Sequence, residues 1–290
     1  MSVERAQPPP RPLLRPRVRE SLRAILTYAV LLLFTVVFVA PFLWMVSTSL
    51  KPDAQIFSDR VQWVPRPFEW HNYADALASF PFLLYLGNTL FICVMAMVGT
   101  VVSAALPAYG FSRLKWKGRD TLFIVLLMTI MLPWPVTALP VFLIFRQLHW
   151  TGTFLPLIVP PFLGSAFSIF LLRQFFMTIP QELSDAARID GCTELGILNR
   201  VIVPMAKPAL ATVALFAFTS AWMDFINPLM YLHDERMYTL AIGLQSFLGR
   251  HSLEWASLMA AATVITIPMV VLFFFAQRTF IEGIALTGIK

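Results

Sequence analysis

Charged residues are scarce in this sequence. They make up 13% of its 290 residues, whereas 58% are hydrophobic and the mean hydropathy is +0.72. A soluble domain carries roughly twice that charged fraction. The composition therefore excludes an ordinary soluble domain and predicts a membrane protein.

Cysteine, histidine and glycine are too few, or too poorly placed, to form a disulfide, a metal site or a phosphate-binding loop. The two cysteines, Cys93 and Cys192, are predicted on a spanning segment and on a loop, where they cannot form a disulfide. The four histidines show no metal-ligand spacing, and none of the 12 glycines precedes a lysine, as a phosphate-binding Gly-Lys loop requires. We expect no catalytic residue, metal site or cofactor-binding site in this chain.

Long apolar runs are abundant instead. A helix that crosses the hydrocarbon core needs about 20 mostly apolar residues. Six runs reach that length, the fifth interrupted by Asp224: 24–50, 76–112, 121–145, 147–172, 208–232 and 255–277. The second run is too long for one straight helix, so its first third is predicted to lie at or outside the membrane surface. The expected fold is all-α, with six transmembrane helices.

Basic residues are sorted by side of the membrane. Sixteen of the 22 Lys and Arg residues fall before the first run, between the second and third, between the fourth and fifth, or after the sixth. The positive-inside rule places this side, and with it both termini, in the cytoplasm. The sorting also accounts for the pI of about 9.6 without a nucleic-acid partner. We predict a multi-pass protein of the cell inner or plasma membrane, in contact with membrane lipid.

Proline marks both the start of the chain and its spans. Residues 1–22, rich in Pro and Arg, cannot bury a core and are predicted to be a disordered cytoplasmic tail, followed by one transmembrane domain over 23–290. Inside the third run, MLPWPVTALP at 131–140 places three prolines close together. Such breaks persist where neighbouring helices or a water-filled cavity satisfy the freed carbonyls. A single proline is explained by its general frequency in membrane helices, but this cluster favours a bundle with a gated cavity.

One polar segment, SDAARIDGCTELGILNRVIVP at 184–204, interrupts the apolar chain on the predicted cytoplasmic side. Pro180 predicts the start of a short helix, with Asp185 in its opening turns. Gly191 predicts its C-terminal cap, and Thr193 is expected to cap a second helix. A short amphipathic helix joined to a spanning helix would move that helix when a partner pushed on it.

The same segment resembles the EAA loop of ABC importer permeases, whose pattern is Glu-Ala-Ala, three residues, Gly, nine residues, Ile, one residue and Leu-Pro. Seven positions match, with Asp for Glu and Val for Ile and Leu: Asp185, Ala186, Ala187, Gly191, Val201, Val203 and Pro204. The resemblance covers about 85–290 and includes AYGFSRLKWKGRD at 108–120 and AWMDFINPL at 221–229. These stretches are similar to carbohydrate importers, above all to the six-span partner of the maltose-type permease pair. Met223 departs from that family, which often has Asn after the Trp.

The resemblance implies the fold of a type I ABC importer permease, with a core at about 85–280 and a coupling loop at 180–204. In that family the loop docks on a cytoplasmic ATPase. By this likeness, an ATPase dimer would bind the ATP, a second permease would complete a hetero-dimer, and an extracytoplasmic solute-binding protein would deliver the solute. Asp185, Ala186 and Ala187 would face the ATPase, and the residues assigned to coupling are Glu182, Asp185, Ala186, Ala187, Asp190, Gly191 and Pro204.

Asp224 is the acidic residue that lies well inside a predicted span. A carboxylate at the bilayer centre costs about 2.5–3.5 kcal/mol on insertion scales, so it is expected to face protein or water. Trp222, Asp224 and Asn227, together with Trp134, would stack on a sugar and hydrogen-bond its hydroxyls. The alternative is a structural hydrogen bond from Asp224 to a neighbouring span, with the nearby aromatic residues serving only as packing.

We therefore expect a permease subunit of an ATP-driven importer for a sugar or sugar-like solute. Other solutes stay open, such as glycerol phosphate, an amino acid or a polyamine. A self-sufficient secondary transporter is less favoured, because it would need inverted repeats and more intramembrane ionisable residues. A membrane enzyme would need a catalytic constellation that the sequence does not offer.

Overall fold

A computed structural model describes residues 16–58, 61–248 and 254–287, and within these ranges the chain forms helices and turns but no strand. The all-α class is confirmed. The elements up to the middle of the chain are α1 (Pro16–Ser49), α2 (Asp53–Ile56), α3 (His71–Ala78), α4 (Phe82–Arg113), α5 (Arg119–Ile130), α6 (Trp134–Gln147), α7 (Leu155–Ile158) and the 3₁₀ turn η1 (Pro160–Leu163).

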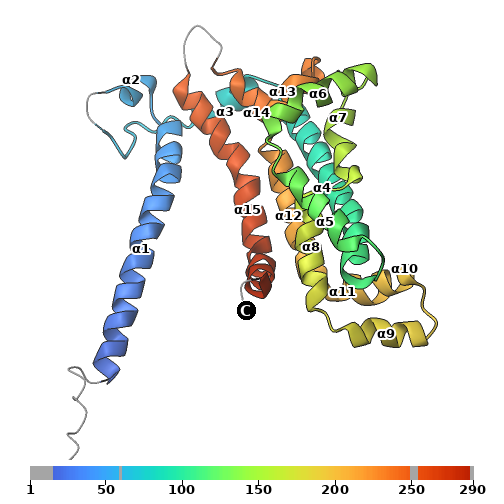
Figure 1. The fold of residues 1–290 in the computed structure, drawn as a ribbon. Coiled ribbons are helices and arrows are strands. Elements are labelled where there is room, and N and C mark those ends of the chain that lie inside the picture. Colours follow the sequence, from blue (N-terminus) through green and yellow to red (C-terminus); the bar gives the residue numbers. More distant parts are fainter. Residues whose placement is uncertain (1–15, 59–60, 249–253, 288–290) are drawn as a thin grey trace, which may run out of the picture.

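The second half continues the same pattern of long helices joined by short ones (Figure 1). Its elements are α8 (Ala166–Thr178), α9 (Gln181–Ile189), α10 (Glu194–Ile197), the π-helical turn η2 (Leu198–Ile202), α11 (Val203–Met205), α12 (Lys207–Trp222), α13 (Ile226–Tyr231), the 3₁₀ turn η3 (Glu235–Met237), α14 (Leu240–Gln245) and α15 (Trp255–Thr287).

Four helical segments of the described chain are long and apolar enough to cross a membrane. They are 20–49, 82–113, 155–178 and 255–277. Two further pairs qualify only as bent spans, α5 with α6 at 96° and the α10–α11 stretch with α12 at 83°. The six predicted spans are therefore reached when each bent pair is counted as one span.

The bend between α5 and α6 has its cause in the proline cluster. Pro133 lies in the extended region at φ −68° and ψ 137°, directly before α6, and Pro135 occupies the first turn of that helix. Proline disfavours helical backbone at the residue before it and cannot donate to the preceding turn. The run 121–145, predicted as one span, is therefore two helices at nearly a right angle.

Three segment boundaries also differ from the prediction. The first residues of the second run belong to α3, which ends at Ala78, and the separate helix α4 runs unbroken from Phe82, so the piece that precedes the long helix is shorter than the predicted first third. The fourth span begins at Leu155 rather than near residue 147. Helix α1 begins at Pro16, inside the predicted tail 1–22, while residues 1–15 lie outside the described part of the chain.

Helix α4 lies at the centre of the bundle and contacts α8, α12 and η1. A Cβ on Gly99 would lie only 2.6 Å from the Phe162 ring, so glycine at this position permits the close approach of α4 and η1. Further along α4, Ala104 and Ala108 are buried in a core cluster with residues of α8 and α12. Small residues on α4 thus allow its neighbours to pack closely, as is usual in membrane bundles.

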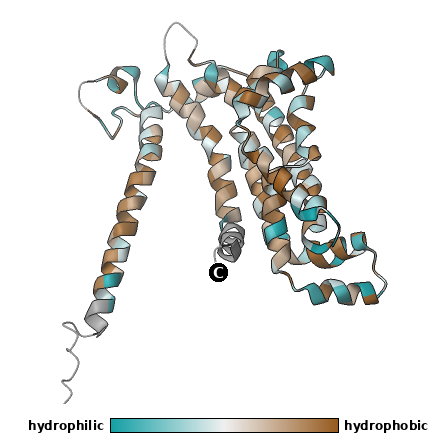
Figure 2. Cartoon of the chain, in the orientation of Figure 1, coloured by the Kyte–Doolittle hydropathy of each residue, from teal (hydrophilic) through white to brown (hydrophobic). Residues whose placement is uncertain are grey.

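Short helices lie at both ends of the bundle. Helices α9, α10 and α11 lie at one end, below the spanning helices in Figure 1, and α3, α13 and α14 lie at the other. Figure 2 shows hydrophilic residues gathered at these ends and hydrophobic residues along the lengths of α1, α4 and α15. We call these the α9 end and the α13 end.

Candidate functional site

The polar segment 184–204 folds locally as its sequence predicts. Helix α9 follows Pro180, and Gly191 has φ +82° directly after the helix cap at Asp190. The Thr193 hydroxyl accepts a hydrogen bond from the backbone N–H of Gly196 at 3.2 Å, which caps α10. Each turn is determined by a residue whose conformational or capping preference is local.

Arg188 joins the two short helices of this segment. Its guanidinium donates to Asp185 Oδ1 at 2.6 Å, to Glu194 Oε1 at 2.8 Å and to Glu194 Oε2 at 3.2 Å. The Tyr109 hydroxyl, on α4, donates to the same Glu194 carboxylate. The hydrogen bond with Glu194 raises the pKa of the Arg188 guanidinium above its ordinary value. One carboxylate therefore connects α9, α10 and the central helix α4.

Arg113 connects α4 to the start of α9 by a second route. Its side chain is buried and donates to the backbone carbonyls of Phe176 and Ile179 and, at 2.9 Å, to Gln181 Oε1. The carbonyls belong to the C-terminal end of α8, where a cation is electrostatically favoured. Sequence reasoning counted Arg113 only as a basic loop residue. Its position at the end of a long apolar run, one turn after Tyr109, was the available signal.

The predicted coupling residues do not all face outward. Six of them are exposed on the surface of the α9 end: Glu182, Asp185, Ala186, Asp190, Gly191 and Pro204. Ala187 is only 8% exposed and packs into the core cluster that includes Ile197. The expectation that Ala187 faces a partner is corrected, because Ser184 and Ala187 lie three residues apart on the buried face of α9. Its small side chain lets α9 approach the bundle.

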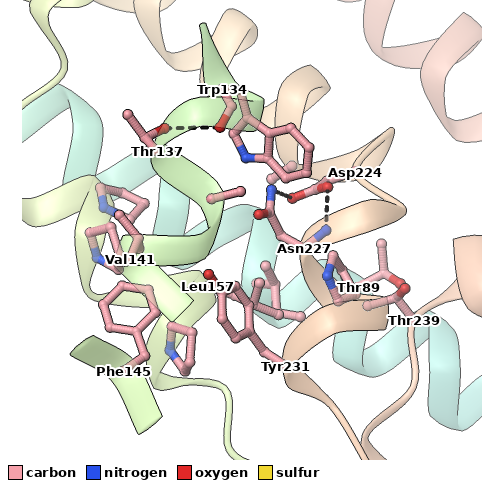
Figure 3. A pocket seen from close by; sticks show the side chains of 17 residues that line it. Thr89, Trp134, Thr137, Val141, Phe145, Leu157, Asp224, Asn227, Tyr231 and Thr239 are labelled. Carbon is pink, nitrogen blue, oxygen red and sulfur yellow. Dashed lines mark hydrogen bonds between the residues drawn. The ribbon is translucent and has the colours of Figure 1, made fainter. Parts of the chain in front are cut away.

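A cavity of about 310 Å³ lies toward the α13 end, between α4, α6, η1 and α13. Seventeen residues line it, mostly apolar, and Figure 3 shows their side chains. The polar or aromatic members are Thr89, Trp134, Thr137, Phe145, Asp224, Asn227, Tyr231 and Thr239. Three of the four residues predicted to contact solute are therefore brought together, from segments about 90 positions apart in the sequence.

Asp224 lies in the turn between α12 and α13. Its Oδ1 accepts from the backbone N–H of Asn227 at 3.1 Å, and its Oδ2 accepts from the Asn227 side-chain amide at 2.8 Å (Figure 3). This is the geometry of a carboxylate that caps the first turn of a helix. The structural alternative for Asp224 is thus realised, but with a residue of its own segment rather than with a neighbouring span.

Trp222 does not line the cavity, which corrects its predicted role. The ring is 6% exposed and stacks on Phe218, with ring centroids 5.8 Å apart. Trp222 is the last residue of α12, and the chain turns before Asp224, so the two side chains point into different surroundings.

Residues 96–285 match the family described as the binding-protein-dependent transport system inner membrane component. The chain belongs to this family. It is therefore a multi-pass inner-membrane permease subunit from a family that is not enzymatic. Among the described residues no group of three or more His, Cys, Asp and Glu side chains is placed to hold a metal.

Several relatives are named for carbohydrate substrates. The chain is 30% identical to the diacetylchitobiose uptake permease DasC of Streptomyces coelicolor, with 90% of this chain and 95% of the relative covered. It is 29% identical to the lactose permease LacG of Rhizobium radiobacter, with 92% and 96% covered. The sulfoquinovosyl glycerol permease SmoH of Agrobacterium fabrum is 30% identical, with 86% and 88% covered.

A solved structure has the same fold. A chain of a bacterial ABC transporter for the acidic polysaccharide alginate superposes with a TM-score of 0.79 at 24% identity, covering 92% of this chain and 99% of that chain. Because the identity is below a quarter, this likeness establishes the fold alone.

Proposed function

We propose that this permease subunit forms part of the translocation pathway of an ATP-driven importer for a sugar or sugar-like solute, and that it couples to a separate cytoplasmic ATPase through residues 182–204. The single observation that carries the proposed coupling is that α9 exposes one face at the surface while hydrogen bonds attach its segment to the central helix α4. The names of the relatives support a carbohydrate as the solute. The alternative solutes to test are glycerol phosphate, an amino acid and a polyamine.

Apolar side chains are exposed on α9, outside the spans found by length and composition. Ile189 is 86% exposed and Leu183 is 40% exposed, beside the charged residues Asp185 and Asp190. Burying a side chain of this size is worth about 1.5–3 kcal/mol, so an exposed Ile in water favours a protein partner. A groove on an ATPase would cover this surface.

The segment that contains α9 is attached to α4, so it can transmit movement along that helix. Tyr109 and Arg113 attach it to one end of α4, and Thr89 and Ile92 near the other end of the same helix line the cavity. Ile92 and Tyr109 are separated by about 25 Å of helix at 1.5 Å per residue. Displacement of α9 by ATPase closure would therefore reach the cavity through one rigid element, as alternating access requires.

Orientation follows from the basic residues. The predicted cytoplasmic segments at the start of α1, between α4 and α5 and around α9 lie at the same end of the bundle (Figure 1). We propose that the α9 end faces the cytoplasm, where ATP is available. The α13 end then faces outward, toward an extracytoplasmic solute-binding protein.

A second permease subunit would complete the complex. The apolar stretch of α1 has none of its residues buried within this chain, and among the spanning helices its extensive packing is with α15 alone. An exposed apolar helix is compatible with lipid, and it also offers contact surface to another membrane subunit. By family likeness that subunit is a different chain.

Co-purification from the native membrane tests this proposal. The tagged wild type is expected to bring an ATPase and a second permease, and Ile189→Asp is expected to lose the ATPase while retaining the permease. Val61→Asp is the matched control, because Val61 is 72% exposed in the segment after α2, at the opposite end. An ATPase retained by Ile189→Asp, or no ATPase with the wild type, would refute coupling through α9.

The same preparation identifies the solute class. Reconstituted with its co-purifying chains, the complex is expected to accumulate a labelled oligosaccharide only when ATP is present. Uptake driven by an ion gradient without ATP would instead establish a secondary transporter.

A further inference from the structure

The charge of the cavity lining carries an inference about the solute, and it rests on the proposed function. Asp224 is the one carboxylate among the 17 residues that line the cavity, which include no Lys, Arg or His and all belong to the described chain. Arg146 follows the lining residue Phe145, but Arg146 is exposed and is not part of the lining. The cavity therefore carries a negative charge that no cation of the lining balances.

The Asp224 side chain is held in place by two hydrogen bonds. Its two carboxylate oxygens are engaged by the backbone and side-chain nitrogens of Asn227, at 3.1 Å and 2.8 Å. Each carboxylate oxygen has a second lone pair, so a solute hydroxyl can still donate to it. The charge is thus both anchored and available to hydrogen-bond donors.

The rest of the lining suits a neutral sugar. Trp134 is 47% exposed and offers a ring face beside Asp224 (Figure 3). Thr239 is a lining residue whose buried hydroxyl has no hydrogen-bond partner among the described residues. A buried hydroxyl without a partner costs free energy, which a polar solute or water recovers. Apolar walls with a few fixed polar groups are typical of small-molecule sites.

We propose that this cavity admits uncharged, hydroxyl-rich sugars and disfavours acidic ones, with Asp224 as the residue that sets this charge selectivity. The relatives divide along this property: diacetylchitobiose and lactose are uncharged, whereas sulfoquinovosyl glycerol is anionic. A fixed carboxylate in a partly apolar cleft lowers the local concentration of anions, and such focusing changes rates by 10-fold or more.

Thiol labelling tests the charge directly and needs no knowledge of the solute. The variant Ala138→Cys places a reporter in the cavity, in a Cys192→Ser background, while Cys93 stays because it is fully buried. The full-length protein in its native membrane is treated with two methanethiosulfonate reagents of similar size, one carrying trimethylammonium and one carrying sulfonate. Their rate ratio is normalised to the ratio for free cysteine.

We expect the normalised cation-to-anion ratio to be about 10, falling toward 1 with Asp224→Asn, which keeps the helix cap and removes the charge. The matched control is Asp234→Asn, the same change in an exposed residue outside the lining, and it is expected to leave the ratio unchanged. Val141→Cys, one turn further along α6, is a second reporter in case Ala138→Cys does not fold. A wild-type ratio at or below 1, or no response to Asp224→Asn, would overturn the proposal.

The labelling experiment tests the cavity charge and the transport experiment tests the importer assignment, so each can fail without the other. A ratio near 10 in a protein that brings no ATPase would leave the cavity charge established and the importer assignment refuted. Accumulation of an acidic sugar as the transported solute would overturn the selectivity while leaving the importer intact.

Discussion

The charged side chains at the α9 end and the charged side chain at the cavity are bonded in opposite ways. At the α9 end, Arg188 bonds to Glu194 on α10 and Arg113 bonds to Gln181 on α9, so these contacts join helices. At the cavity, Asp224 bonds to Asn227 three residues on, within its own segment. Polar contacts between elements near the cavity are made by uncharged groups instead, such as Asn88, which donates to the carbonyls of Arg236 and Tyr238.

This difference has an energetic reason. Contacts between elements stabilise their relative positions, because breaking one leaves a buried group unpaired. A contact within a turn stabilises that turn and does not fix it to a neighbouring helix. Arg188 and Arg113 are therefore suited to transmitting a displacement between helices, whereas the Asp224 carboxylate stabilises its own turn and lines the cavity. The predictions below set matched changes at the two ends against each other.

The largest effect is expected from Arg113→Met. The change leaves the carbonyls of Phe176 and Ile179 and the Gln181 side chain without their donor, and a buried acceptor without a donor costs about 1–3 kcal/mol. We expect unfolding in mixed micelles to occur at clearly lower denaturant, a loss of about 2–4 kcal/mol in total. The exposed Arg146, on α6 at the α13 end, is the control, and an equal loss with Arg146→Met would contradict the proposed anchor.

The next effect is expected from Tyr109→Phe, which deletes the hydroxyl that joins α4 to Glu194. Glu194 keeps Arg188, so stability should fall by only about 1–2 kcal/mol. Transport per ATP hydrolysed by the reconstituted complex should fall several-fold, because one of the two links between α4 and the α9 segment would be lost. Tyr73→Phe removes a hydroxyl bonded to Ser49 at 2.7 Å at the opposite end and should leave this ratio unchanged. If both variants behave alike, Tyr109 has no coupling role.

A more local effect is expected from Gly191→Val. No heavy atom lies within 4 Å of the added Cβ, so the cost arises from φ +82°, which a β-branched residue adopts at about 1–2 kcal/mol. The turn after α9 should distort, and recovery of the ATPase should decrease. Gly87→Val meets the same open space in α4 without a positive φ and is expected to retain full recovery. Loss of the ATPase in both variants would point to general misfolding.

The smallest stability effect is expected at the cavity. Asp224→Asn keeps a good helix cap and should change the free energy of unfolding by no more than about 0.5 kcal/mol, whereas Asp224→Ala should cost about 1 kcal/mol. Thermal unfolding of the purified protein measures both. A loss with Asp224→Asn as large as with Asp224→Ala would show that the charge itself stabilises the fold, and the comparison between the two ends would then fail.

Local signals in the sequence predict much of both ends. Thr193 and Gly191 each act within a few residues of their own position, so the turns around α9 follow from residue type alone. The proline cluster at 131–140 likewise marks a break in a span, although not its angle of 96°. Trp134, Asp224 and Asn227 were recognised as polar or aromatic residues in apolar surroundings, and the fold brings them to one cavity.

Other features escaped prediction because they depend on distant partners. Ala187 matches the exposed part of a motif, but the inward face of α9 is determined by where the core of the bundle lies. Trp222 is two residues from Asp224, yet it is buried in a core cluster with residues from distant segments, such as Tyr85, Leu240 and Ala260. Arg113 looked like one of many basic loop residues until its acceptors were known.

The sequence by itself determined that this chain is an all-helical membrane protein, where its apolar segments run, and which polar segment carries the family's motif. Hydrophobic length, proline placement and helix capping act over a few residues, so they can be read along the chain. Only the tertiary structure decided that Tyr109 and Arg113 attach the α9 segment to α4, and that no basic residue of the cavity lining balances the Asp224 carboxylate. Those properties depend on segments up to 150 positions apart (Thr89 and Thr239 both line the cavity), which come together only once the helices have packed.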